Sequence, residues 1–194
     1  MRSGSRFVSR PSWLLLGGLI GLAIATPILR SVAATPPKVG DTLPDLELPT
    51  ADGSSVRLSK MSAGGPLVLV VLRGFPGYQC PLCTAQFGDL RGKAKEFAAA
   101  KANVVLIYPG AASGLKDHAG EFVGASALPS NFRFTIDPDF KAVTRLGLRW
   151  NAPGETAYPS TFVLDGKRKV VFARVSRSHG DRASAAAILA ALPR

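Results

Sequence analysis

Residues 67–90 read LVLVVLRGFPGYQCPLCTAQFGDL and carry the clearest indication of the fold. It opens with the apolar run Leu67–Leu72, which is typical of a strand buried on both faces. It closes on a helical pattern in which Phe87 and Leu90 recur at the spacing of one helix face. Between them lies Cys80-Pro81-Leu82-Cys83, which holds the only two cysteines of the chain. The pattern predicts a dithiol at the junction of a buried strand and a helix.

The position of the cysteines at a helix start favours redox chemistry. Pro81 suits the first helical position, which makes Cys80 the N-cap and places Cys83 in the first turn. Unpaired backbone N–H groups and the positive end of the helix dipole favour an anion there, so a reactive thiolate is stabilised. A disulfide across two residues closes a loop too short to stabilise the fold much. We therefore expect Cys80 and Cys83 to be catalytic.

Two other functions for the cysteine pair stay open at the level of sequence. The first is a metal-binding module in which two thiolates clamp copper(I), a soft ion that prefers sulfur ligands. Zinc is disfavoured because it requires four ligands, and neither His118 nor His179 has ligand-like spacing to the cysteines. The second is a structural domain with two inert thiols. A redox enzyme, by contrast, needs no metal and no organic cofactor, only a reducing partner.

Apolar patterns on both sides of this stretch predict the remaining elements. Leu46–Leu48 and Val56–Leu58 resemble the strands of a hairpin around the turn Asp52-Gly53. Asn103–Tyr108 is a second apolar run, so strand, helix and strand form a βαβ unit with two parallel strands. The helix after the cysteines is expected to continue through Ala94 and Phe97, and two more helices are expected over Lys116–Gly124 and over Asp139–Leu146, the second of them started by Asp137-Pro138. Two strands are expected over Thr161–Leu164 and Lys169–Val175. A final helix, capped by Asp181, is expected to contain Ile188, Leu189 and Leu192.

The first residues have the composition of a targeting segment. Their start is basic, and residues 14–29 are mostly apolar over a run shorter than a spanning helix requires. Small residues at 31–34 suit signal cleavage, whereas Arg30 favours an uncleaved anchor. We therefore expect residues 1–34 to be a signal peptide or an N-terminal membrane anchor. Residues 35–194 are then an exported domain, periplasmic or secreted.

Length and charge limit the classes of protein that fit. The chain of 194 residues carries a formal net charge of +11, and removal of the leader with its four arginines leaves +7. A domain of this length can bury a core without disulfides. A positive charge can attract nucleic acid or anionic lipid. Here the basic residues are scattered and only Lys167–Lys169 cluster, in a predicted turn. We therefore expect no nucleic-acid partner, and membrane contact only through residues 1–34 if they stay uncleaved.

The predicted order of elements resembles the thioredoxin-like fold. This implies an α/β class, with a central mixed β-sheet flanked by helices and an N-terminal β-hairpin extension. Residues 39–192 are similar to the redoxin group, which includes alkyl hydroperoxide reductases and thiol-specific antioxidant proteins, the peroxiredoxins. The residues that carry the resemblance are Val39–Asp45, Leu48, Asp52-Gly53, Val56–Leu58 and, most specifically, Arg73–Cys83.

The resemblance implies an antioxidant thiol oxidoreductase that reduces a peroxide or a protein disulfide, with a thiol reductant as electron donor. Peroxiredoxins resemble Pro-x-x-x-Thr/Ser-x-x-Cys, and Pro76, Cys80 and Cys83 fit if a cysteine replaces the hydroxyl residue. On that alignment Cys83 attacks the peroxide and becomes a sulfenic acid, which Cys80 resolves as a disulfide. Thioredoxins instead use the first cysteine, here Cys80, to attack a substrate disulfide, and Cys83 resolves the product. Both chemistries stay open.

The resemblance also implies a substrate-binding surface around the dithiol. In thioredoxin-like proteins a cis-proline faces the cysteines directly before a strand, and Pro159 has that place here. Together with Pro159, we expect Pro76, Tyr78 and Tyr158 to contact substrate. Peroxiredoxins carry an arginine where this chain has Pro159, so the peroxidase chemistry lacks its usual cation at that position.

Four residues are candidates to support the site. Arg73, Arg149 or Arg174 can replace the missing arginine if the fold brings one of them to the thiols. His179 is a further candidate because histidine is the side chain suited to proton exchange near neutral pH. The alternative for His179 is a local hydrogen bond beside the predicted turn and cap at Gly180-Asp181.

Overall fold

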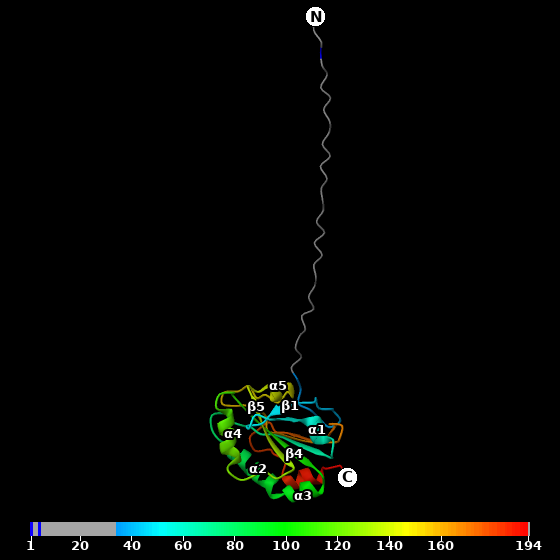
Figure 1. The fold of residues 1–194 in the computed structure, drawn as a ribbon, viewed down its shortest axis with the longest axis vertical. Helices are drawn as coiled ribbons and strands as arrows, with labels where there is room; N and C mark the ends of the chain where they lie inside the picture. The colour runs from blue at the N-terminus through cyan, green and yellow to red at the C-terminus, as the bar shows by residue number, and fades with distance from the viewer. Residues whose placement is uncertain (2–3, 5–33, 194) are drawn as a thin grey trace. The chain divides into compact units, whose positions relative to one another are not determined.

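The computed structural model describes residues 1, 4 and 34–193, and the elements of Figure 1 all lie in the last of these ranges. The expectations for a signal peptide or membrane anchor fall almost entirely outside the described residues. Within the described part of the chain, no helix is both long and apolar enough to cross a membrane.

A five-stranded mixed sheet forms the centre of the fold. Its strands follow the order β5-β4-β3-β6-β7, in which β3 pairs with β4 in parallel and with β6 in antiparallel register. Thr161 of β6 and Leu106 of β4 flank Val70 of β3, so the central strand is covered on both edges. The strands span Leu67–Val71 (β3), Asn103–Gly110 (β4), Phe132–Pro138 (β5), Ser160–Leu164 (β6) and Val170–Val175 (β7).

Helices cover both faces of this sheet. Both faces are apolar because successive side chains of β3 point to opposite faces and all of them are apolar. Val68 and Val70 pack into one buried cluster, while Leu67 and Leu69 pack into the other. The first face carries α2 (Pro81–Gly92), α3 (Ala94–Ala99), α4 (Leu115–Val123) and α6 (Ala185–Ala190). The second carries α1 (Leu58–Ser62), α5 (Lys141–Arg145) and the hairpin of β1 (Glu47–Pro49) and β2 (Ser55–Arg57). Figure 1 shows α2 and α3 beside the C-terminal helix, drawn in red. The predicted fold class and N-terminal hairpin are confirmed.

The edge strand β5 was absent from the sequence prediction, which placed only a helix start at Asp137-Pro138. Both residues instead end β5. The helix starts later than predicted because Asp139 and Phe140 have φ of 56° and 62°, which no α-helical residue adopts. The Asp137 carboxylate nevertheless serves the helix start, since it accepts hydrogen bonds from the backbone N–H groups of Ala142 and Val143 at 2.8 and 2.9 Å.

Two helix boundaries also differ from the prediction. The helix after the cysteines is interrupted at Lys93, whose φ and ψ of −108° and 17° leave the helical region and separate α2 from α3. The predicted cap of the last helix, Asp181, is wrong. Ser184 caps α6, because its hydroxyl accepts from the N–H of Ala187, and Asp181 instead pairs with Arg174 at 2.8 Å.

A close backbone approach fixes the segment that leads from β3 to the cysteines. Gly74 has a φ of 73°, and a Cβ at this position would overlap the carbonyl oxygen of Pro109. The N–H of Phe75 donates to that same carbonyl at 3.0 Å. Only glycine fits here, and the contact ties the segment before Cys80 to the end of β4.

Candidate active site

The two cysteines lie at the N-terminus of α2, as predicted. Pro81 is the first helical residue, and Cys80 is the N-cap with an extended backbone. The N–H of Cys83 donates to the Cys80 sulfur at 3.3 Å. Both thiols are free, and the exposed fractions of the two residues are 3% for Cys80 and 0% for Cys83. Small reagents can therefore reach Cys80 more readily than Cys83.

One guanidinium contacts both sulfurs. The Nη2 of Arg182 lies 3.8 Å from the Cys80 sulfur and 3.5 Å from the Cys83 sulfur. Its Nη1 donates to the side-chain oxygen of Gln86 at 2.9 Å, and its Nε donates to the backbone carbonyl of His179 at 2.9 Å. All three nitrogens have a partner, so the cation is held in a fixed orientation against the dithiol.

These contacts separate the pKa values of the two thiols. A hydrogen bond from the Cys83 thiol, joined by the Cys83 N–H, lowers the pKa of Cys80 to about 5 against the opposing effect of burial. The charges of Arg182 and Arg73 lower it further. The pKa of Cys83 is raised, first because its proton is held in the bond to Cys80 and second because it is buried. At neutral pH the site therefore holds a Cys80 thiolate and a Cys83 thiol.

A carboxylate connects further polar residues beside the dithiol. One oxygen of Glu155 accepts from Arg73 Nε at 2.7 Å, and the other lies 2.9 Å from His179 Nε2. Arg73 also donates to the hydroxyl of Tyr78 at 2.6 Å. Burial raises the pKa of Glu155, but the hydrogen bonds from Arg73 and His179 outweigh it, so the net pKa is lowered. Glu155 is thus ionised between two basic side chains.

The expected substrate-contacting residues divide into two groups. Tyr78 is exposed and half-buried Pro76 follows the Gly74 turn, both on the segment that precedes Cys80. Tyr158 stacks on Trp150 with ring centroids 4.8 Å apart, and buried Pro159 directly precedes β6.

The predicted cis peptide bond at Pro159 is wrong, since no peptide bond among the described residues is cis. The chain on either side is held in ordinary extended pairing. The backbone N–H of Tyr158 donates to the carbonyl of Leu148 at 2.9 Å, and the carbonyl of Pro159 accepts from the N–H of Ser176 at 2.9 Å.

Two of the four candidate supporting residues lie away from the thiols. Arg149 donates to the carbonyls of Trp150, Glu155 and Thr156 and lies over the ring of Phe140. Arg174 is an exposed partner of Asp181. The other two, Arg73 and His179, join the Glu155 network.

Sequence reasoning passed over the three residues that complete the site: Gln86, Glu155 and Arg182. For Glu155 and Arg182 the sequence offers one signal: each is a charged residue close to a glycine, in a loop next to a predicted hairpin strand. That signal does not tell such loops from ordinary surface turns.

The site does not resemble a metal clamp. Among the described residues no group of three or more His, Cys, Asp or Glu side chains could hold a metal ion. Among residues 34–193, the charged side chain that contacts the two sulfurs is the cation Arg182. A fixed positive charge at both sulfurs disfavours a bound metal cation, so the copper alternative is not favoured.

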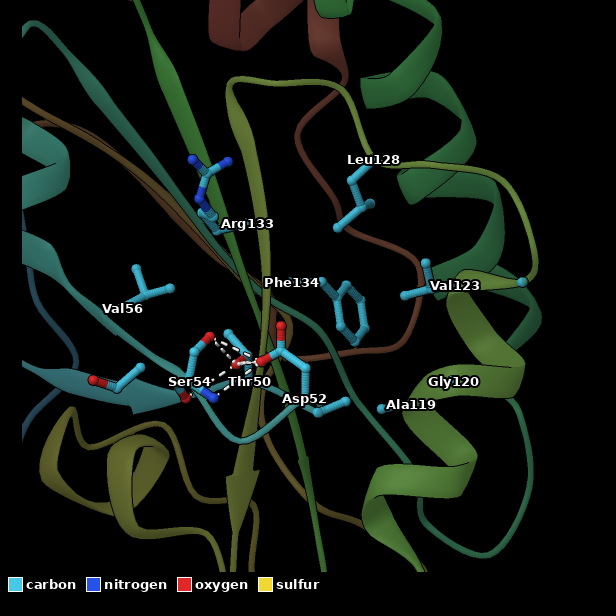
Figure 2. A pocket seen from close by; sticks show the side chains of 13 residues that line it. Thr50, Asp52, Ser54, Val56, Ala119, Gly120, Val123, Leu128, Arg133 and Phe134 are labelled. Atoms are coloured by element: carbon cyan, nitrogen blue, oxygen red, sulfur yellow. Dashed lines mark hydrogen bonds between the residues drawn. The ribbon is translucent and has the colours of Figure 1, made fainter.

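Two of the cavities in the fold are compared with the position of the cysteines. One of about 360 Å³ opens beside the Glu155 network, between Pro76 and the loop that carries Gly154 and Glu155. A second, of about 440 Å³, lies between α4, β5 and the hairpin turn, where the Thr50 hydroxyl and the Ser54 N–H donate to the Asp52 carboxylate (Figure 2). Neither cysteine lines this second cavity.

Comparison with known proteins points to one family. The Redoxin family model matches residues 38–189. Putative peroxiredoxin Rv2521 of Mycobacterium tuberculosis is 33% identical over 144 residues, which are 70% of this chain and 83% of that protein. Putative peroxiredoxin Rv1608c of the same organism is 41% identical over 70 residues, so the matched part spans 36% of this chain and only 44% of that relative.

Solved structures agree in fold. The crystal structure of Peroxidoxin BcpB from Mycobacterium tuberculosis is similar with a TM-score of 0.61 and 30% identity, over 79% of this chain and 95% of that one. That of a putative Thiol:disulfide interchange protein DsbE from Chlorobium tepidum has a TM-score of 0.59 and 25% identity, over 80% and 99% of the two chains. The structural relatives thus carry names from both chemistries that the sequence left open.

Proposed function

This chain belongs to the Redoxin family, and on that premise we propose that it is a thiol-dependent peroxidase with Cys80 as the attacking thiolate and Cys83 as the resolving thiol. The observation that carries the proposal is the Arg182 guanidinium 3.8 and 3.5 Å from the two sulfurs, at a helix start where Cys80 is the N-cap. A positive charge beside a low-pKa thiol is what attack on a peroxide requires.

The reaction runs in two chemical steps and a reduction. The Cys80 thiolate attacks one oxygen of the peroxide, the O–O bond breaks, and the second oxygen leaves as hydroxide or alkoxide and takes a proton from solvent. Cys80 is then a sulfenic acid. The Cys83 sulfur attacks the Cys80 sulfur, its proton leaves with the hydroxyl group as water, and a Cys80–Cys83 disulfide forms. Two electrons and two protons from a thiol reductant restore the dithiol.

This assignment reverses the roles that the peroxiredoxin motif implies. On the motif Cys83 is the attacking residue, but its pKa is raised and its side chain is fully buried. Cys80 has the lowered pKa and the small exposed fraction. Since the thiolate is the nucleophile, the electrostatics favour Cys80.

Arg182 takes the role that family members give to an arginine at the position of Pro159. Its Nη2 can donate to the oxygen that becomes the leaving group as it does to the sulfurs, because the guanidinium is already oriented by Gln86 and by the carbonyl of His179. Such a preorganised donor stabilises the charge that develops on the departing oxygen.

A second candidate function is the reduction of protein disulfides. The likeness to the DsbE structure favours it, and so does Cys80 itself, which is the attacking position in thioredoxins. The 3% exposure of Cys80 favours the smaller substrate, because a protein disulfide needs more open access to the sulfur than a peroxide does.

The test is to mix the reduced protein with one molar equivalent of hydrogen peroxide and to trap sulfenic acid for mass spectrometry. We expect thiol loss much faster than that of a free cysteine, an adduct on Cys80, and then a Cys80–Cys83 disulfide. Loss no faster than that of a free thiol would reject the peroxidase and leave disulfide reduction, which is assayed with a reduced chain and an oxidised protein substrate.

The proposal includes export, on the strength of the leader pattern of residues 1–34 alone. Export supplies the setting in which a reversible dithiol is useful, since disulfides persist outside the cytosol. Fractionation of cells that express the full chain, with determination of the N-terminal residue, tests both export and cleavage. Recovery of uncleaved protein in the cytosolic fraction would reject export.

A further inference from the structure

We propose that His179 is a positioning residue that holds Arg182 against the two thiols, through its contact with Glu155. The inference rests on the proposed function, because it concerns the cation that the dithiol uses. The His179–Glu155 contact joins two loops, the loop over residues 176–182 and the loop that carries Glu155. The peroxidase chemistry itself does not require this contact.

The loop over residues 176–182 is fixed at its ends, and His179 is its central attachment. At its start, the N–H of Ser176 donates to Pro159 at 2.9 Å. Just after its end, the N–H of Ala185 donates to the carboxylate of Asp89 at 2.7 Å. Between these ends, His179 hydrogen-bonds across to Glu155 at 2.9 Å, and exposed Asp181 pairs with Arg174 of β7 at 2.8 Å.

The same residue that makes this contact also holds the cation. The backbone carbonyl of His179 accepts from Arg182 Nε at 2.9 Å. The orientation of the Arg182 guanidinium therefore depends on the position of His179. Displacement of the imidazole from Glu155 moves the backbone carbonyl that orients the guanidinium. Within residues 34–193, Gln86 and the sulfurs are then the partners that remain to the guanidinium.

The surroundings of the contact favour its persistence. The Glu155 side chain is only 11% exposed, and its second oxygen is bound to buried Arg73 at 2.7 Å. The indole of Trp150 lies 5.2 Å from the imidazole of His179, between ring centroids. The groups that face the imidazole are thus the Glu155 carboxylate, with Arg73 behind it, and the Trp150 ring. A charge-assisted hydrogen bond whose carboxylate is largely buried is stronger than one between two exposed groups.

A double-mutant cycle tests the role of His179. The full chain is prepared as the parent, His179→Ala, Arg182→Met and the double variant. The pKa of Cys80 is measured in each from the pH dependence of alkylation by iodoacetamide, with the modified cysteine identified by mass spectrometry. This readout needs no peroxide, so it is independent of whether the chain is a peroxidase. His179→Gln is the conservative control, because its amide N–H can still donate to Glu155.

We expect Arg182→Met to raise the pKa of Cys80 by about 1–3 units, the range that a neighbouring charge produces. His179→Ala should reproduce at least half of that rise, although His179 touches neither sulfur. The double variant should match Arg182→Met alone, because both changes remove the same cation from the thiols. His179→Gln should restore the parent value.

Three results would overturn the proposal. The first is a His179→Ala variant with the parent pKa at Cys80. The second is a double variant whose shift is the sum of the two single shifts. The third is failure of His179→Gln to restore the parent pKa while its circular dichroism and thermal unfolding match the parent. Since the imidazole is 43% exposed and Arg182 is half-buried, we expect all of these variants to fold.

Discussion

Replacement of Arg182 by methionine removes the guanidinium that contacts both sulfurs and keeps most of the apolar side chain. In the folded protein the Nη2 lies 3.8 Å from the Cys80 sulfur. At that separation a charge pair is worth about 1 kcal/mol in bulk water and about 4 kcal/mol at an effective dielectric of about 20. Since one unit of pKa corresponds to about 1.4 kcal/mol, the substitution should raise the pKa of Cys80 by about 1–3 units.

The difference in the thiolate fraction of Cys80 between the parent and Arg182→Met is largest at mildly acidic pH. With a pKa of about 5, the Cys80 thiol is about nine-tenths thiolate at about pH 6. A rise of about 2 units leaves about one-tenth as thiolate at that pH, so alkylation should slow about tenfold. At about pH 9 both proteins are ionised, and their rates should converge.

The assay is the rate of iodoacetamide modification of Cys80 in the reduced protein, followed from acidic to alkaline pH. Arg174→Met is the matched control, because Arg174 is an exposed arginine that pairs with Asp181 and does not touch the thiols. The control should follow the parent curve. If Arg182→Met also follows it, Arg182 does not stabilise the thiolate and the description of the site is wrong.

Three further substitutions test other parts of the structure. Gly74→Ala should destabilise the protein by about 2 kcal/mol or more beyond Gly77→Ala in urea unfolding, because both residues have positive φ but only a Cβ at Gly74 would overlap the end of β4. Asp137→Ala should cost about 1–3 kcal/mol in the same measurement, since two buried N–H groups lose their acceptor; Asp137→Asn keeps one acceptor and should lose less. Cys83→Ser should leave Cys80 reactive toward peroxide but let its sulfenic acid persist, which dimedone labelling measures; rapid disappearance of that adduct in the variant would contradict a resolving role for Cys83.

Local patterns were sufficient to predict the strand–dithiol–helix unit. The run Leu67–Leu72 is buried on both faces, as a continuous apolar run of this length predicts. Pro81 can only be accommodated in the first turn of a helix, which fixed Cys80 as the N-cap before any tertiary contact was considered. The residues of this unit, whose environment is set within one turn of chain, were therefore placed correctly.

The residues that were missed owe their place to contacts across the fold. Arg182 is 102 residues from Cys80 in sequence, and its guanidinium reaches the sulfurs only because α6 packs beside α2. Glu155 is 82 residues from Arg73, its partner. Strand β5 was missed for a related reason: Arg133 interrupts its apolar pattern on the exposed side, and its pairing with β4 supplies the order that the local pattern lacks.

Competitive alkylation shows which of the two cysteines is the thiolate of this site. The reduced protein is treated with less than one equivalent of iodoacetamide near pH 6, and the modified residue is identified by mass spectrometry after digestion. A pKa lowered at Cys80 and raised at Cys83 predicts label on Cys80 almost alone, with a rate that falls as the pH drops through about 5. Label on Cys83, or equal label on both residues, would contradict the account.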